Sequence, residues 1–205
     1  MWHVLVRGGW MMLPLALCSV VAVTVIIDRF FFFRGLKPEG RAEAVIELVR
    51  EGSLDEARRI AGEPGKKEGE HLPVMKVLSA GIAHASDPTG AMETAATAEV
   101  SAMKRGLVAL DTIITLSPLL GLLGTIIGMI NAFNIMASAG LGQPHAVTGG
   151  VAEALICTAA GISVAVVSLV PYNYFLSRVE GETDIIESYA TRLEMAMSAS
   201  AKGQP

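Results

Sequence analysis

The sequence predicts an all-α, polytopic membrane protein with three transmembrane helices and long helical extensions into the cytoplasm. Three long apolar runs alternate with segments that hold nearly all of the charged residues. A hydrocarbon core about 30 Å thick takes roughly 20 helical residues to cross, and each run is long enough to do so. The polar segment between the first two runs also has the periodicity of an amphipathic helix, which supports the all-α prediction.

The first apolar run, over residues 8–33, is expected to be a retained span rather than a cleaved signal peptide. A cleaved signal has an apolar core of about 7–15 residues that ends in small residues. Here the run continues well past Cys18, and Leu17 is too large for the position before the cysteine of a lipoprotein cleavage box. The first run is therefore predicted to cross the membrane.

The polar segment that follows is predicted to be helical. Its first helix has an apolar stripe and is broken by Gly52, and Ser53-Leu-Asp-Glu56 has the capping-box spacing for a second. A third is expected over about 72–85. Asp87-Pro88 is the expected start of a long helix because Asp suits the N-cap and Pro the first helical position. With only isolated glycines beyond it, that helix is expected to run to about Ser138. The stripe consists of Ala44, Val45, Leu48 and Val49.

The distribution of Lys and Arg predicts the topology. Residues 34–105 contain eleven Lys and Arg residues, whereas the loop between the second and third apolar runs contains none. The positive-inside rule then places the long segment and the carboxyl tail in the cytoplasm. The predicted organisation is an external amino terminus with the first span (1–33), a cytoplasmic helical segment (34–105), the second span (106–138), an external loop (139–146), the third span (147–177) and a cytoplasmic helix and tail (178–205).

One charged residue stands out within the second and third spans. From Thr112 to Ser177, Glu153 is the one residue whose side chain is charged at neutral pH. A carboxylate inside a span costs at least a few kcal/mol, so such a residue is a functional candidate by default. The alternative is a purely structural carboxylic acid, hydrogen-bonded to the backbone or to the side chain of Asn131.

Two threonines are predicted to form a polar layer near this carboxylate. If the external loop is centred between Leu141 and Gly142, Thr125 lies as far before the turn as Thr158 lies after it. Residues equidistant from the turn of two antiparallel helices lie at about the same depth, which would place both hydroxyls level in a pore. The alternative is that each hydroxyl only bonds to the preceding turn of its own helix.

Small residues along the second and third spans favour close helix packing. The Gly124-x-x-x-Gly128 spacing allows backbones to approach each other, and Pro118 is expected to bend the second span. The positions predicted for packing and kinking are Ser117, Pro118, Gly121, Gly124, Gly128, Gly161 and Pro171.

Composition excludes several functional classes. The formal net charge of −4 argues against a nucleic-acid partner, which would require a basic surface. The two cysteines fall inside predicted spans, and the four histidines are scattered without ligand-like spacing, so no metal site is expected. No nucleotide-binding or hydrolase motif is present. We therefore expect neither an enzyme nor a bound cofactor.

The two longest specific motifs resemble a known family. The second span reads Leu116-Ser-Pro-Leu-Leu-Gly-Leu-Leu-Gly-Thr-Ile-Ile-Gly-Met-Ile-Asn-Ala-Phe133. The third reads Gly149-Gly-Val-Ala-Glu-Ala-Leu-Ile-Cys-Thr-Ala-Ala-Gly-Ile-Ser-Val-Ala165, followed by Pro171-Tyr-Asn173. Together they closely resemble the proton-channel family of ExbB, TolQ and MotA, in its ExbB/TolQ branch. The resemblance is strong over residues 106–173 and elsewhere is one of layout.

The resemblance implies a function as well as a fold. Members form an oligomeric ring in the bacterial inner membrane, typically a homopentamer, around an ExbD/TolR-like single-span partner that carries an essential Asp. The complex uses the proton gradient, through a TonB/TolA-like protein, for outer-membrane transport or envelope integrity. Thr125, Thr158 and Glu153 then line the proton pathway. Another proton-driven stator, such as one for gliding, and a non-conducting membrane scaffold are the competing interpretations.

Overall fold

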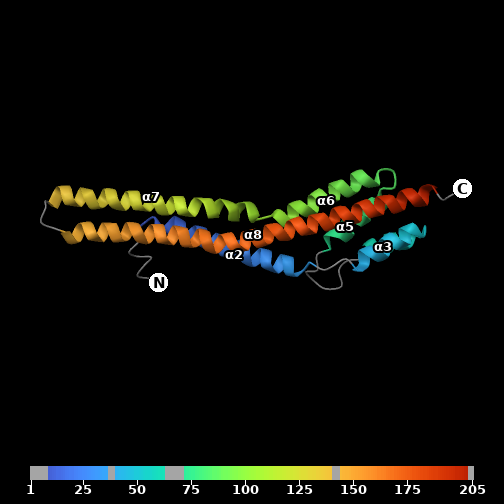
Figure 1. Cartoon of the computed structure of the whole chain (residues 1–205), viewed down its shortest axis with the longest axis horizontal. Coiled ribbons are helices and arrows are strands. Elements are labelled where there is room, and N and C mark those ends of the chain that lie inside the picture. The colour runs from blue at the N-terminus through green and yellow to red at the C-terminus, as the bar shows by residue number, and fades with distance from the viewer. Residues whose placement is uncertain (1–8, 37–39, 63–71, 140–143, 203–205) are drawn as a thin grey trace. The chain divides into compact units, whose positions relative to one another are not determined.

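In the computed structural model the described residues are 9–36, 40–62, 72–139 and 144–202, and nearly all of them are α-helical. The all-α prediction is confirmed. Three helical stretches, in α2, α7 and α8, are long and apolar enough to cross a membrane. The helices are α2 (Met12–Arg34), α3 (Gly40–Arg50), α4 (Leu54–Gly62), α5 (Pro73–Ala83), α6 (Pro88–Lys104), α7 (Leu107–Ala139) and α8 (Pro144–Lys202) (Figure 1).

The chain divides into two compact units. The first, which we call the apolar unit, consists of Met1–Asp28 and Gly106–Tyr174. The second, which we call the polar unit, consists of Arg29–Arg105 and Phe175–Pro205. The long helix α8 contributes to both, as predicted from the continuation of the third span into a polar-faced helix.

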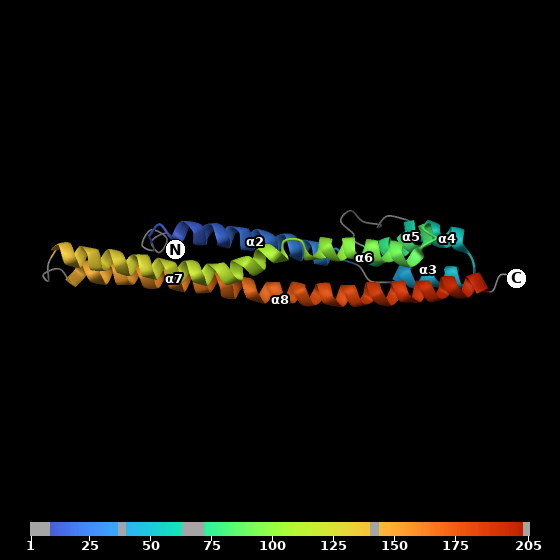
Figure 2. The same ribbon diagram turned by 90° about the horizontal axis from the view of Figure 1, so that it is seen from above.

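The apolar unit is an antiparallel α7–α8 pair with α2 packed along it. Both views show α7 and α8 side by side over their apolar lengths (Figures 1 and 2). Two clusters of buried side chains hold α2 in place. The outer one consists of Met11, Met12, Leu15 and Cys157, and the other is formed by Ala22, Leu110 and Ile113.

Small residues set the register between α7 and α8. A Cβ atom added to Gly121 would lie 3.1 Å from Thr158 Cα, and one added to Gly128 would lie 3.1 Å from Ala154 Cβ. A Cβ on Gly161 would overlap the Ser117 carbonyl oxygen. The two backbones therefore touch along this line, as the predicted close-packing positions require.

The predicted continuous helix from Pro88 to about Ser138 is wrong. Helix α6 ends at Lys104, and α7 begins at Leu107. Arg105 has ψ of 131°, and Gly106 has φ of +80°, a left-handed conformation that glycine adopts without steric cost. One isolated glycine thus ends a helix here because it reverses the sign of φ.

The polar unit has a conventional hydrophobic core. Helix α5 is the most buried element, with seven of its eleven residues in the core, and α4 and α6 pack against it. At Gly81 of α5, Met92 of α6 and Leu193 of α8 converge, with Leu193 Cδ2 lying 3.4 Å from the Cβ position of the glycine. Phe33 stacks on Phe175 with ring centroids 5.5 Å apart.

Local signals in the polar unit gave a mixed outcome. The Asp87 side chain accepts a hydrogen bond from the Gly90 amide at 3.0 Å, which confirms the predicted N-cap, and Gly52 ends α3 with φ of +80°. The predicted stripe of α3 is partly wrong. Ala44 is exposed, and the buried face is instead formed by Ala42, Val45, Ile46 and Val49.

Candidate functional site

Glu153 lies in the N-terminal part of α8, half-buried, with its carboxylate against the backbone of Gly9. The space that a Cβ atom of residue 9 would fill is taken by Glu153 Oε1. Gly9 lies just before α2 and has φ of +69°. The carboxylate therefore contacts the first predicted span, and no pattern in the sequence predicts this contact.

One turn further along α8, Cys157 forms the junction of three helices. Its side chain is buried with Met11, Met12 and Leu15 of the α2 segment. It also fills the space beside Gly124 of α7, whose Cβ position lies 2.9 Å from Cys157 Cβ. Glu153 and Cys157 thus present neighbouring positions of one α8 face to the start of α2, since residues four apart share a face.

The two candidate threonines make different hydrogen bonds. Thr158 Oγ1 donates across the helix pair to the Gly121 carbonyl oxygen at 3.1 Å. Thr125 Oγ1 donates to the Leu122 carbonyl oxygen of its own helix at 2.6 Å. Within the described residues neither hydroxyl is bonded to Glu153. The Thr125 hydroxyl is therefore bonded within its own helix, whereas the Thr158 hydroxyl links the two helices.

The contacts around the threonines show how α7 and α8 are aligned. Thr158 bonds to Gly121, about one helical turn from Thr125 along α7, and its neighbour Cys157 lies against Gly124, the neighbour of Thr125. This alignment follows from the fit of Gly121, Gly128 and Gly161 against their partners, because close backbone contact is possible at only a few relative positions of the helices. The equal depth of the two threonines in a pore stays a prediction.

The sequence also singled out Ser117, Asn131 and two prolines. Ser117 is fully buried in the crossing beside Gly161, and its Oγ has no hydrogen-bond partner within the part of the chain that is described. Asn131 is exposed and lies nearly a turn beyond Glu153, because its neighbour Ala132 packs against Gly150. Pro118 and Pro171 lie inside α7 and α8, and both helices continue through them.

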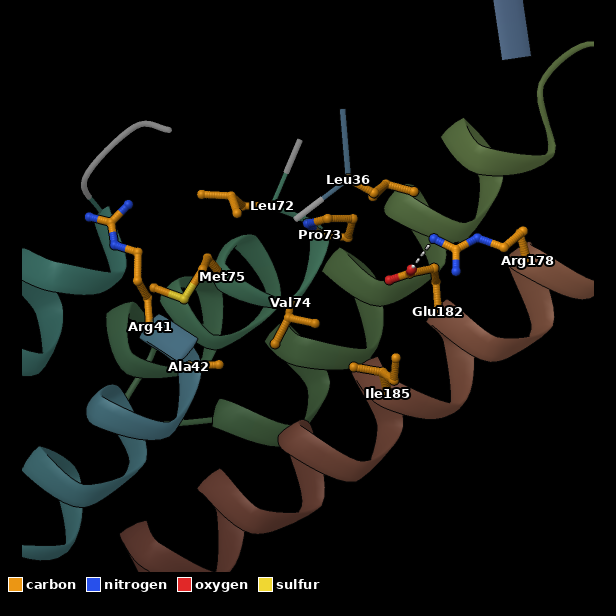
Figure 3. A pocket seen from close by; sticks show the side chains of 10 residues that line it. All are labelled: Leu36, Arg41, Ala42, Leu72, Pro73, Val74, Met75, Arg178, Glu182 and Ile185. Carbon is orange, nitrogen blue, oxygen red and sulfur yellow. Dashed lines mark hydrogen bonds and ion pairs between the residues drawn. The ribbon is translucent and has the colours of Figure 1, made fainter. Parts of the chain in front are cut away.

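A separate cavity of about 320 Å³ lies in the polar unit (Figure 3). Its apolar wall comes from Leu72, Val74 and Met75 around α5. Arg178 on α8 also lines it, and its guanidinium is paired with Glu182 at 3.3 Å. Because that cation is already neutralised within its own helix, the cavity presents no convergent set of polar groups comparable with the Glu153 region.

Comparison with known proteins identifies the family of the chain. The model of the MotA/TolQ/ExbB proton channel family matches residues 70–188. The putative biopolymer transport protein ExbB-like 1 of Synechocystis sp. is 35% identical over 199 residues, covering 92% of this chain and 76% of that protein. The biopolymer transport protein ExbB of Salmonella typhimurium is 28% identical over 209 residues, with 95% and 85% coverage. The Tol-Pal system protein TolQ of Pseudomonas aeruginosa is 28% identical over 196 residues, with 88% and 84% coverage.

The three apolar helices and the family match indicate a multi-pass inner-membrane protein, and the matching family is one of transport subunits rather than of enzymes. The chain belongs to the MotA/TolQ/ExbB proton channel family, and its relatives place it in the ExbB/TolQ branch. It is thus an energy-transduction subunit of the ExbB/TolQ type.

Proposed function

We propose that this chain is the ring-forming subunit of a proton-driven motor, acting with an ExbD/TolR-like partner and a TonB/TolA-like protein. In this proposal protons pass between copies of the α7–α8 pair and the partner's membrane Asp. The work is done at the outer membrane, as TonB-type transport or Tol-Pal-type envelope support. A proton moving through about 100 mV releases about 2.3 kcal/mol, which suffices to bias a conformational cycle.

The observation that carries this proposal is the placement of Glu153. It is the one charged side chain over residues 112–177, and it lies against Gly9 before the start of α2, one turn along α8 from Cys157, where the three helices meet. An ionisable residue held inside a helix bundle is the usual mark of a proton or ion pathway. Family membership makes proton passage the first interpretation of that carboxylate.

Exposed apolar surface supports assembly into a ring. On α7, Val108 is 75% exposed and Leu119 57% exposed, and on α8 Val170 is 70% exposed. Lipid and neighbouring copies would both cover such surface. We propose a homopentamer with α7 and α8 facing inward and α2 on the lipid side, and with the amino terminus outside and the polar unit in the cytoplasm, as the Lys and Arg distribution indicates.

The decisive experiment is partner-dependent proton flux into proteoliposomes. Glu153→Gln keeps the size of the side chain and removes its titration, so the complex is expected to assemble while flux is lost. Thr125→Val and Thr158→Val are expected to lower flux with assembly intact. Thr24→Val is the matched control, because Thr24 is an exposed threonine of α2 that bonds only to the Val20 carbonyl oxygen at 2.8 Å. Full flux in Glu153→Gln would remove Glu153 from the pathway.

One observation favours a non-conducting scaffold as the second candidate. The Thr158 hydroxyl is already used to bond α8 to Gly121 of α7. In a scaffold, Thr158→Val would weaken the pair by about 0.6 kcal/mol, and no variant would alter proton flux because there would be none. Flux that is equal with and without the partner would decide for the scaffold.

A further inference from the structure

The first turn of α2 supplies a wall of the Glu153 site. At Gly9 the Cβ position is occupied by Glu153 Oε1, so residue 9 has no room for a side chain while the carboxylate lies there. On α8, one turn before Glu153, a Cβ added to Gly149 would meet nothing within 4 Å. Crowding is therefore not shared by every glycine in this region, and at Gly9 the crowding group is the Glu153 carboxylate.

The charge of the carboxylate suits this location. Helix α2 begins at Met12, preceded by a turn in which the Met12 amide bonds to the Gly9 carbonyl oxygen at 3.1 Å and the Leu13 amide bonds to that of Trp10 at 3.1 Å. The aligned peptide dipoles of a helix place a partial positive charge at its start, and a negative charge near that end is favourable. The first turn of α2 contains no acidic residue of its own.

Packing next to the carboxylate fixes the same turn of α2. Met11 and Met12 are buried against Cys157, and Met11 Cβ lies 3.5 Å from the Cβ position of Gly124. The start of α2 is therefore held by apolar contacts one turn along α8 from Glu153. A displacement of this turn would change both the surroundings of Glu153 and the burial of Cys157.

We propose that the segment just before α2 is part of the proton-handling site, with Gly9 as a positioning residue that leaves room for the Glu153 carboxylate. Only this end of the first span takes part, and the rest of α2 stays on the lipid side of the α7–α8 pair. The role assigned to Glu153 rests on the proposed function, whereas the Gly9–Glu153 contact does not.

The test is suppression by a shorter carboxylate. In the full chain with its partner, Gly9→Ala is expected to lower proton flux about tenfold, since it introduces both a steric overlap and a positive φ for a residue with a side chain. Glu153→Asp withdraws the carboxylate by one methylene. It should lower flux in the parent chain but raise it in the Gly9→Ala chain. If Asp fails to improve Gly9→Ala, glycine is required there only for its φ, and the proposal is overturned.

A second measurement does not depend on transport. In a Cys18→Ala chain, Cys157 is the remaining thiol, and its labelling rate by N-ethylmaleimide reports how well the start of α2 covers it. Gly9→Ala should raise that rate about tenfold. Adding Glu153→Asp should return it toward the parent value, and Gly149→Ala should leave it unchanged. An unchanged rate in Gly9→Ala contradicts the contact, whereas absent flux with the expected labelling pattern rejects the motor and retains the contact.

Discussion

The apolar unit and the polar unit use opposite kinds of residue where their helices meet. Between α7 and α8 of the apolar unit, the fully buried positions include Ser117, Ala132 and Ala154, and glycines face them. In the polar unit the fully buried positions include large side chains such as Leu78 and Leu193. The two units therefore gain their packing energy in different ways.

The difference follows from the solvent around each unit. In water, burying large apolar side chains is favourable by about 25 cal/mol per Å². In a bilayer the lipid tails are as apolar as leucine, so association depends on close van der Waals contact and interhelical hydrogen bonds. Small residues permit both, as the Thr158–Gly121 bond illustrates. The loss of a large buried side chain should therefore destabilise the polar unit, and the gain of a methyl group should destabilise the α7–α8 contact.

The largest expected effect is the loss of a large side chain from the polar unit. Leu193 is completely buried and lies against Gly81, so Leu193→Ala should destabilise the protein by about 2–5 kcal/mol through lost burial and a cavity. Thermal unfolding in mild detergent measures this. Met195→Ala is the control on the same helix, because Met195 is 60% exposed and should change stability by about 0.5 kcal/mol or less. Equal effects would show that α8 is not packed as described.

The gain of one methyl group should have opposite effects on stability at the α7–α8 contact and at an exposed position of the polar unit. Gly161→Ala adds a Cβ that overlaps the Ser117 carbonyl oxygen, and overpacking of this kind costs about 1–3 kcal/mol. Gly181→Ala on the same helix meets nothing within 4 Å and should stabilise by about 0.5–1 kcal/mol, because Ala is the better helix former. Thermal midpoints of the two variants test the pair. A stabilising Gly161→Ala would contradict backbone contact between α7 and α8.

A buried cation in the polar unit should have a smaller effect. Arg29 is 6% exposed, and its Nη1 donates a hydrogen bond to the Ala102 carbonyl oxygen at 3.0 Å, near the C-terminus of α6. A cation there stabilises the helix end, so Arg29→Met should cost about 1–2 kcal/mol. Arg50→Met, which removes only an exposed pair with Glu47, is the control. If both cost the same in thermal unfolding, Arg29 is not a cap.

Much of the fold was predictable because its signals are local. Apolar length gave the three spans, and residue chemistry gave the Asp87 N-cap and the break at Gly52. Gly106 was misjudged because a glycine inside a helix and a glycine that ends one look alike in sequence. Only its φ of +80° separates the two cases.

The candidate site was predictable in its residues but not in their arrangement. Glu153 is conspicuous as a lone charge, yet its contact with Gly9 joins positions 144 residues apart along the chain. No periodicity relates them. The contact of Thr158 with Gly121 depends on the alignment of α7 and α8, which is decided by steric fit at Gly121 and Gly161. Motifs identify candidate residues, and tertiary contacts decide what they face.

The smallest expected effect concerns an exposed ion pair that has no counterpart in the α7–α8 contact. Arg192 of α8 donates a hydrogen bond to Glu43 of α3, and this bond lowers the pKa of the Glu43 carboxyl below its ordinary value of 4.5. A carboxyl with a lowered pKa in the folded state contributes stability above the ordinary value, and that contribution is lost as the pH falls through the lowered one. Glu43→Gln should therefore lower the thermal midpoint slightly at pH 7 and leave it unchanged at a pH below the folded-state pKa of Glu43.

The control is Glu187→Gln, which makes the same charge change at an exposed position of α8. Its effect on the thermal midpoint should not disappear at low pH in this way. Because both partners of an exposed pair are well solvated, a large effect at pH 7 would mean that α3 is held to α8 mainly by charge rather than by its buried face of Val45, Ile46 and Val49.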